Sequence, residues 1–238
     1  SRGDSNTVDW YSTINSYTLN MLGDSTHLND GATYYVSVRA IDHAGNRSDV
    51  LISDGILIDL TPPLLGTIRD GLDMDIDFTQ STTTLSANWL GFIDTVSNIV
   101  NYDVAFTDDT SRFDIISWDS VGLISNYTID TLSSLADQET YFFVIKATDL
   151  AGNISRAFSS DGVTIDYGTP VSGIVYDGLT GDSDWTNSDS TFDISWSGFI
   201  DTVSGIVSYE YAIGTTPGAS NVISWTGNGV DTTVVVNN

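Results

Sequence analysis

The chain has 238 residues, 40% of them apolar, which is enough for one to three domains with hydrophobic cores. Its 32 acidic residues face only 7 lysines and arginines, and the net charge of -25 disfavours nucleic acids and anionic membranes as partners. There is no cysteine, which excludes disulfides, thiolate catalysis and cysteine zinc sites. No apolar run approaches the ~18 residues of a membrane span, so we expect no membrane insertion in this segment.

A segment of predicted strands near the start of the chain occurs twice. Tyr34–Pro63 aligns without a gap with Tyr141–Pro170, at an offset of 107 residues. The same offset relates the heptapeptide GFIDTVS at 91–97 to its copy at 198–204. One repeat unit is therefore about 107 residues long.

The repeat boundaries fall where proline interrupts strand pairing, near residues 59 and 167. This predicts the C-terminal part of one repeat in 1–59, a complete repeat in 60–167 and the N-terminal part of a third in 168–238. The part-repeats at both ends allow neighbouring chains to complete each other by strand addition, or reflect an excerpt from a longer polypeptide.

The middle repeat reads as short alternating strands separated by clusters of Asp, Gly, Ser and Asn. This pattern predicts an all-β antiparallel sandwich with almost no helical periodicity. The expected strands are Leu85–Trp89, Ile99–Phe106, Asp114–Trp118, Tyr127–Thr131, Tyr141–Thr148 and Val163–Asp166.

Several aromatic positions resemble the fibronectin type III pattern. They are a Trp ending the second strand (Trp89, Trp196), a Tyr in the third (Tyr102, Tyr209), and a Leu six residues before a strand-opening Tyr (Leu28 to Tyr34, Leu135 to Tyr141). The A-x-D-x-A-G-N turns at 40–46 and 147–153 are similar to those in bacterial surface repeats. The resemblance implies tandem fibronectin type III-like, immunoglobulin-like Greek-key β-sandwiches, as in the extracellular repeats of adhesins or filaments, with a tyrosine corner in each repeat.

Alternating aspartates after the first predicted junction form one candidate calcium site. Several carboxylates in one loop can surround a hard cation that takes six to eight oxygens. The loop lacks the spacing and the closing Glu of an EF-hand, and a solvated turn on an acidic surface is the alternative. The candidates are Asp70, Asp73, Asp75 and Asp77, with Asp177, Asp182 and Asp184 as counterparts.

A second group of candidates lies at the turns and junctions themselves. It comprises Asp42 and Asp149 in the A-x-D-x-A-G-N turns, and Asp59 and Asp166 just before the linkers. The resemblance implies that such residues hold calcium between successive domains and stiffen a rod. The alternative for Asp42 and Asp149 is that they only make Asx-type turn hydrogen bonds.

Other motifs carry weaker functional interpretations. Arg2–Ser5 reads RGDS, an integrin-recognition tripeptide followed by Ser, and Trp10, Trp118 and Trp225 could stack on sugars or pack in the sandwich. His27 and His43 lack the neighbours of a Ser-His-Asp triad, and the acids lie in turns without a Glu pair. We therefore expect no enzyme activity.

The sequence thus predicts a non-catalytic structural or adhesive segment of an extracellular, cell-surface repeat protein. We expect a rod or filament stalk stiffened by calcium, whose partners are neighbouring repeats or copies of itself, with surface glycans or proteins as further partners. The alternatives are a glycan- or protein-binding module and a spacer of a large secreted enzyme.

Overall fold

The computed structural model describes residues 27–111 and 115–237. Arg2–Ser5, Trp10 and Asp114 lie outside these residues. By its contacts the chain divides into two compact units, one of 1–75, 86–128 and 142–162 and the other of 76–85, 129–141 and 163–238. The repeat boundaries near residues 59 and 167 stay a sequence prediction. None of the described residues forms a helix long and apolar enough to cross a membrane.

The described residues form strands joined by turns and loops, so the predicted all-β fold is confirmed. The strands are β1 (Thr33–Tyr34), β2 (Ser37–Val38), β3 (Leu51–Ile52), β4 (Ile56–Leu57), β5 (Thr67–Asp70), β6 (Phe78–Thr79), β7 (Leu85–Leu90), β8 (Ile99–Thr107), β9 (Ile116–Gly122), β10 (Asn126–Ile129), β11 (Thr140–Asp149), β12 (Phe158–Ser159), β13 (Val163–Ile165), β14 (Ile174–Tyr176), β15 (Thr191–Ser197), β16 (Glu210–Ile213), β17 (Ile223–Gly227) and β18 (Thr233–Asn237).

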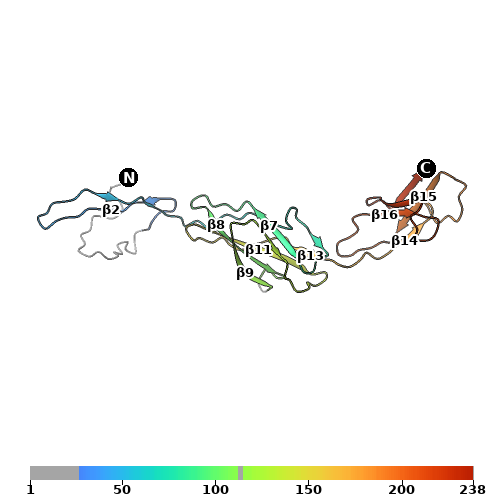
Figure 1. The fold of residues 1–238 in the computed structure, drawn as a ribbon, viewed down its shortest axis with the longest axis horizontal. Coiled ribbons are helices and arrows are strands. Elements are labelled where there is room, and N and C mark those ends of the chain that lie inside the picture. Colours follow the sequence, from blue (N-terminus) through green and yellow to red (C-terminus); the bar gives the residue numbers. More distant parts are fainter. Residues whose placement is uncertain (1–26, 112–114, 238) are drawn as a thin grey trace. The chain divides into compact units, whose positions relative to one another are not determined.

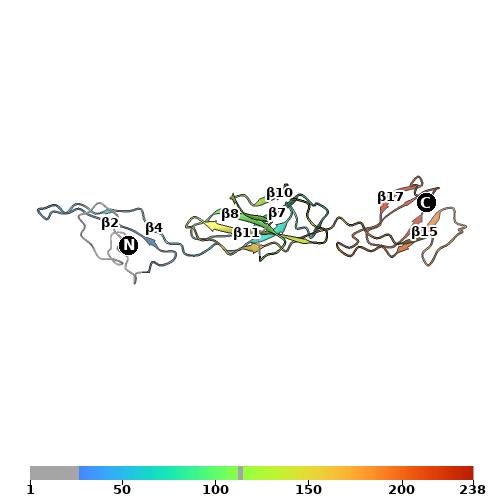
Figure 2. The ribbon, with the colours of Figure 1, turned by 90° about the horizontal axis from the view of Figure 1, so that it is seen from below.

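The middle repeat is a fibronectin type III-like β-sandwich (Figure 1). One sheet has the order β10-β7-β5, and the perpendicular view shows β10 beside β7 (Figure 2). The other has the order β6-β13-β11-β8-β9, with β12 also paired to β11. The chain crosses between the sheets after β5, β6, β7, β9 and β10, so strands distant in sequence become neighbours, as in a Greek key.

Alternation along the strands builds the core between the sheets. In β7 the inward-facing Leu85, Ala87 and Trp89 are buried while the intervening residues are partly exposed. Trp89 packs edge-on against Tyr102 of β8, with 5.7 Å between ring centroids, and so joins the two sheets. Phe106 and Phe143, both fully buried, extend this contact between β8 and β11.

Strand pairing repeats at the same offset as the sequence. Thr33 pairs with Leu57 as Thr140 pairs with Thr164, and the sheet β14-β15-β18 has the same order as β5-β7-β10 in the preceding repeat. Both tyrosine corners are confirmed: the Tyr34 and Tyr141 hydroxyls accept hydrogen bonds from the backbone N–H groups of Asn29 (2.9 Å) and Ala136 (3.1 Å). The 107-residue offset therefore relates the hydrogen bonds of successive repeats as well as their amino-acid sequences.

Two glycines allow the strand after each junction to approach its neighbour. A Cβ on Gly173 would collide with the backbone oxygen of Ser197, and one on Gly66 would collide with that of Leu90. A Cβ on Gly227, in the same unit as Gly173, would meet nothing within 4 Å. Close backbone packing thus requires glycine at the first two positions and not at the third.

We expect Gly173→Ala to weaken the pairing of β14 with β15 by roughly 1–3 kcal/mol, because the collision is with backbone that cannot rotate away. Hydrogen–deuterium exchange of the β14 amides should accelerate about tenfold or more. Gly227→Ala is the matched control and should leave exchange there unchanged. Equal exchange in both variants would contradict the interpretation.

Candidate metal centre

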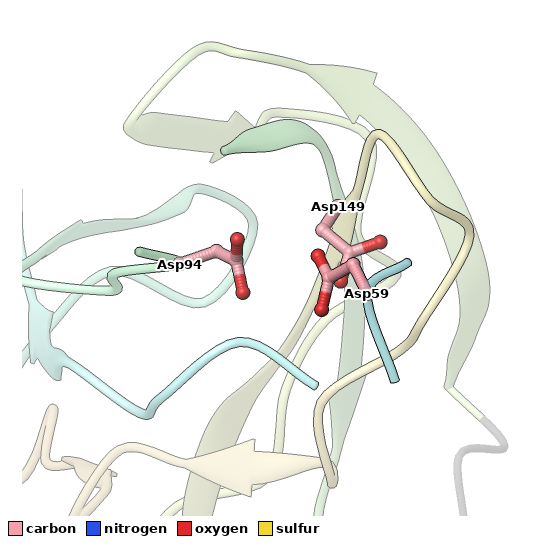
Figure 3. Close-up of side chains that lie close together, drawn as sticks. All are labelled: Asp59, Asp94 and Asp149. Atoms are coloured by element: carbon pink, nitrogen blue, oxygen red, sulfur yellow. The ribbon is translucent and has the colours of Figure 1, made fainter. Parts of the chain in front are cut away.

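Three aspartates from distant parts of the chain meet in the first unit. Asp59 precedes the linker to the middle repeat, Asp94 lies in the turn after β7, and Asp149 ends β11. Each offers a carboxylate oxygen, and these oxygens all lie within 4.8 Å of one another. Figure 3 shows the carboxylate of Asp94 facing those of Asp59 and Asp149. Asp59 is 7% exposed and Asp149 is 1% exposed, so two of the three are shielded from water.

Backbone amides hold the side chains of Asp94 and Asp59 in place. Asp94 Oδ1 accepts hydrogen bonds from the N–H groups of Val96 (3.0 Å), Ser97 (2.7 Å) and Asn98 (3.0 Å). Asp59 Oδ1 accepts one from Thr61 N–H at 3.0 Å. These are turn contacts that Asp makes readily, and they leave the second oxygen of each carboxylate for other partners.

Asn153 connects the turn after β11 to the linker. Its backbone N–H donates to Asp149 Oδ1 at 2.8 Å, and its side-chain amide donates to Asp149 Oδ2 at 2.9 Å. The same amide nitrogen donates to the backbone oxygen of Asp59 at 3.1 Å. The Asn153 side chain therefore links the backbone of the linker at Asp59 to the carboxylate of Asp149.

The unpaired oxygen of Asp59 points to a ligand. Asp59 Oδ2 is buried and accepts no hydrogen bond from the described residues. A buried charged oxygen without a donor is costly, and here two further carboxylates lie beside it. A divalent cation coordinated by oxygen would satisfy Asp59 Oδ2 and offset the repulsion, so the residues present fit calcium.

The next junction repeats part of this arrangement in the second unit. Asp166 and Asp201 stand 107 positions after Asp59 and Asp94. The N–H group of Ser204 donates to both Asp201 Oδ1 (2.8 Å) and Asp166 Oδ2 (3.2 Å), which places the two carboxylates side by side. Hydrogen bonds from the backbone, chiefly that of Gly205, lower the pKa of Asp201. The position equivalent to Asp149 would lie beyond residue 238.

Asp42, the counterpart of Asp149, makes turn hydrogen bonds. It is exposed and accepts bonds from Ala44 N–H (2.9 Å) and from the backbone and side chain of Asn46 (both 2.8 Å). The Asn46 side chain is the main cause of its lowered pKa. Asp42 belongs to neither three-carboxylate cluster found within 27–111 and 115–237. Asp149, in contrast, makes turn hydrogen bonds and also belongs to the cluster with Asp59 and Asp94.

The aspartates of the loop after β5 separate into two groups. Asp70 and Asp75 join a second cluster with Asp161. Asp73 and Asp77 belong to neither cluster in the described part of the chain. The same holds for Asp177, Asp182 and Asp184, although Asp182 Oδ1 accepts the Asp177 N–H at 3.2 Å, as Asp75 Oδ1 accepts that of Asp70 at 2.8 Å.

Five acids that hold or complete these sites were missed from the sequence. Asp94 and Asp201 lie in the two copies of the GFIDTVS heptapeptide and Asp161 in a repeated Ser-Asp-Gly, so their recurrence was the available signal. Asp30 fixes the first linker by accepting Leu60 N–H (2.8 Å) and the Thr61 hydroxyl (2.6 Å), the latter being the main cause of its lowered pKa. Asp137 does the same for Tyr167 N–H at 3.1 Å.

The aromatic and histidine candidates lie at the surface. Trp225 is 67% exposed, whereas Trp118 is half-buried with the Lys146 ammonium 3.8 Å from its ring centroid. His27 and His43 are exposed. Trp89 and Trp196, in contrast, are buried.

No protein-family model matches the chain, and no curated protein matches its sequence. Among solved structures, the chain is similar to the crystal structure of chicken CNTN1 FN1-FN3 domains. The identity is 18% and the TM-score 0.36, over 86% of this chain and 67% of that chain.

We expect Asn153→Ala to loosen the first linker, because it removes the donor shared by Asp59 and Asp149. The loss should be roughly 1–2 kcal/mol for these hydrogen bonds, measured as faster hydrogen–deuterium exchange of the Leu60, Thr61 and Leu64 amides. Asn46→Ala is the control, since Asn46 bonds to Asp42 in its own turn. Unchanged exchange in Asn153→Ala would show that the linker is held without Asn153.

Proposed function

We propose that this chain is a non-catalytic structural segment of an extracellular repeat protein, a rod or filament stalk whose junctions are stiffened by calcium. The observation that carries the proposal is the buried Asp59 Oδ2, which accepts no hydrogen bond from the described residues and lies in a cluster of three carboxylates. Asp59, Asp94 and Asp149 would hold the ion.

The position of the three ligands explains how calcium would act on a junction. Asp59 belongs to the segment just before Pro62 and Pro63, whereas Asp94 and Asp149 belong to turns of the middle repeat. An ion bound to all three fixes the linker to those turns and restricts rotation about its backbone bonds. It also screens part of the net charge of -25, which otherwise drives the acidic segments apart.

Calcium titration of the calcium-free 238-residue chain by calorimetry tests this proposal. Saturable binding is expected, and Asp94→Asn should weaken it at least about tenfold because affinity depends on the number of charged ligands. The asparagine keeps the Oδ1 acceptor for the three turn amides. Asp73→Asn is the matched control, since the exposed Asp73 belongs to neither cluster.

Small-angle scattering of the same samples measures stiffness. Calcium should narrow the distribution of particle lengths for the wild type and Asp73→Asn, and leave that of Asp94→Asn as in chelator. Binding with no change in scattering would remove the stiffening role, and the absence of saturable binding would remove the calcium site.

One observation favours a binding module as the second candidate. Trp225 is 67% exposed and lines an open cleft with Phe192, Pro217 and Ala219 in the second unit. Exposed aromatic rings can stack on sugar rings, so glycans are the partner class of this alternative. Specific binding on a glycan array, lost in Trp225→Ala, would support it.

A further inference from the structure

A second group of three carboxylates lies in the first unit and shares no residue with the junction cluster. Asp70 is the last residue of β5, Asp75 follows in the next loop, and Asp161 precedes Gly162, just before β13. One carboxylate oxygen of each lies within 4.8 Å of the other two. The cluster thus joins the loop after β5 to the turn that leads into β13.

Asp70 supplies an observation independent of the clustering. Its side chain is fully buried, and its Oδ2 accepts a hydrogen bond from Gly162 N–H at 2.9 Å. Its Oδ1 is buried and accepts no hydrogen bond from the described residues. The Asp70 carboxylate therefore lies beside two other carboxylates and has one buried oxygen without a donor, which makes its burial costly unless a ligand is bound.

The electrostatics around Asp70 agree with this geometry. Burial is the largest effect and raises the pKa of Asp70 to about 6, although hydrogen bonds from Ser160 and Gly162 oppose the increase. The negative charges of Asp161 and Asp75 raise it further. The charges that act on Asp70 are thus both repulsive, and a bound cation would reverse their effect.

The other two carboxylates of the cluster are accessible from solvent. Asp75 Oδ1 accepts the Asp70 N–H at 2.8 Å, which fixes the loop. The side chains of Asp75 and Asp161 are both solvent-exposed. A cation can therefore enter from solvent at Asp75 and Asp161 and reach the buried Asp70.

The donor set selects the class of cation. All three donors are carboxylate oxygens, which suit calcium or magnesium rather than zinc or copper. Two donors belong to loop segments and one to a strand end, an irregular arrangement that calcium accommodates more readily than the octahedral preference of magnesium. We propose that Asp70, Asp75 and Asp161 form a calcium site within the repeat, which fastens the loop after β5 to the turn before β13.

The proposed site recurs in part in the next repeat. Asp177 and Asp182 reproduce the bond between Asp70 and Asp75 at the 107-residue offset. The position equivalent to Asp161 would lie beyond residue 238. In the other direction, Asp54 is the counterpart of Asp161 and belongs to neither cluster found among the described residues. Asp54 is therefore a matched control for Asp161.

The test is calcium titration of the full chain after chelation, with hydrogen–deuterium exchange to locate the effect. Wild-type protein should bind at two classes of site, and calcium should slow exchange in residues 70–75 and 160–162. Asp161→Asn should abolish this protection and weaken calcium binding at the site within the repeat at least about tenfold. Binding at the junction site, which Asp94→Asn weakens, should stay unchanged. Asp54→Asn should behave as wild type.

A second variant separates ligand loss from damage to the fold. Asp70→Asn removes a buried charge without changing size, so its melting temperature in chelator should equal or exceed that of the wild type. Calcium should raise the melting temperature less in Asp70→Asn than in the wild type. Magnesium in place of calcium should give weaker protection of residues 70–75.

The inference is overturned if Asp161→Asn retains wild-type titration and exchange, or if calcium leaves residues 70–75 unprotected in the wild type. If calcium binding is weakened by Asp161→Asn but not by Asp94→Asn, the junction site alone is ruled out. If binding is weakened by Asp94→Asn but not by Asp161→Asn, only the site within the repeat is ruled out.

Discussion

The burial of carboxylates in a chain with few basic side chains is the constraint on which both clusters depend. With 32 acids and 7 lysines and arginines, the sequence has too few cations to pair its acidic groups. Asp59, Asp70 and Asp149 are nevertheless buried, where an ionised group requires compensation. The fold supplies part of it through backbone amides at turns. Backbone amides do not satisfy every buried carboxylate oxygen, since one oxygen of Asp59 and one of Asp70 lack a hydrogen-bond donor.

Turn hydrogen bonds fix the carboxylates of the junction cluster. Asp94 takes three amides on a single oxygen, and Asp149 is fixed through both oxygens by Asn153. Side chains held this way lose little further conformational freedom when they coordinate an ion. Asx-type bonding and metal binding are therefore compatible at one residue, because a carboxylate offers more lone pairs than one turn uses. At the exposed Asp42 the same turn forms without such a cluster, so the turn motif alone does not define a site.

The sequence predicted the fold better than the sites. Local alternation located β7, β8, β11 and β13 within a residue or so at each end, and the Leu six residues before a strand-opening Tyr predicted the tyrosine corners. β5, β6 and β12 were missed because they are short and lie beside turn-forming residues.

Site composition depends on which turns the sandwich brings together, and residue spacing cannot show this. Asp73 and Asp77 were predicted alongside Asp70 and Asp75 because they alternate in one loop. Residues 71–77 form bends and loop rather than a strand, so their spacing in sequence does not bring all of these side chains to a common point. The partners that complete each cluster, Asp94 and Asp161, come from segments far along the chain. Only the paired sheets bring those segments close.

Each complete cluster draws on residues about 90 positions apart in a repeat of about 107, so almost a whole repeat must fold before either exists. An ion that binds only the folded repeat stabilises it by mass action, about 2.7 kcal/mol at a free concentration 100 times the dissociation constant. Extracellular calcium modules function with dissociation constants near 10⁻⁴–10⁻³ M, so modest affinity suffices outside the cell. Where calcium is scarce, the unpaired buried carboxylates would oppose folding instead. The same residues would thereby couple the folding of each repeat to the calcium concentration of its surroundings.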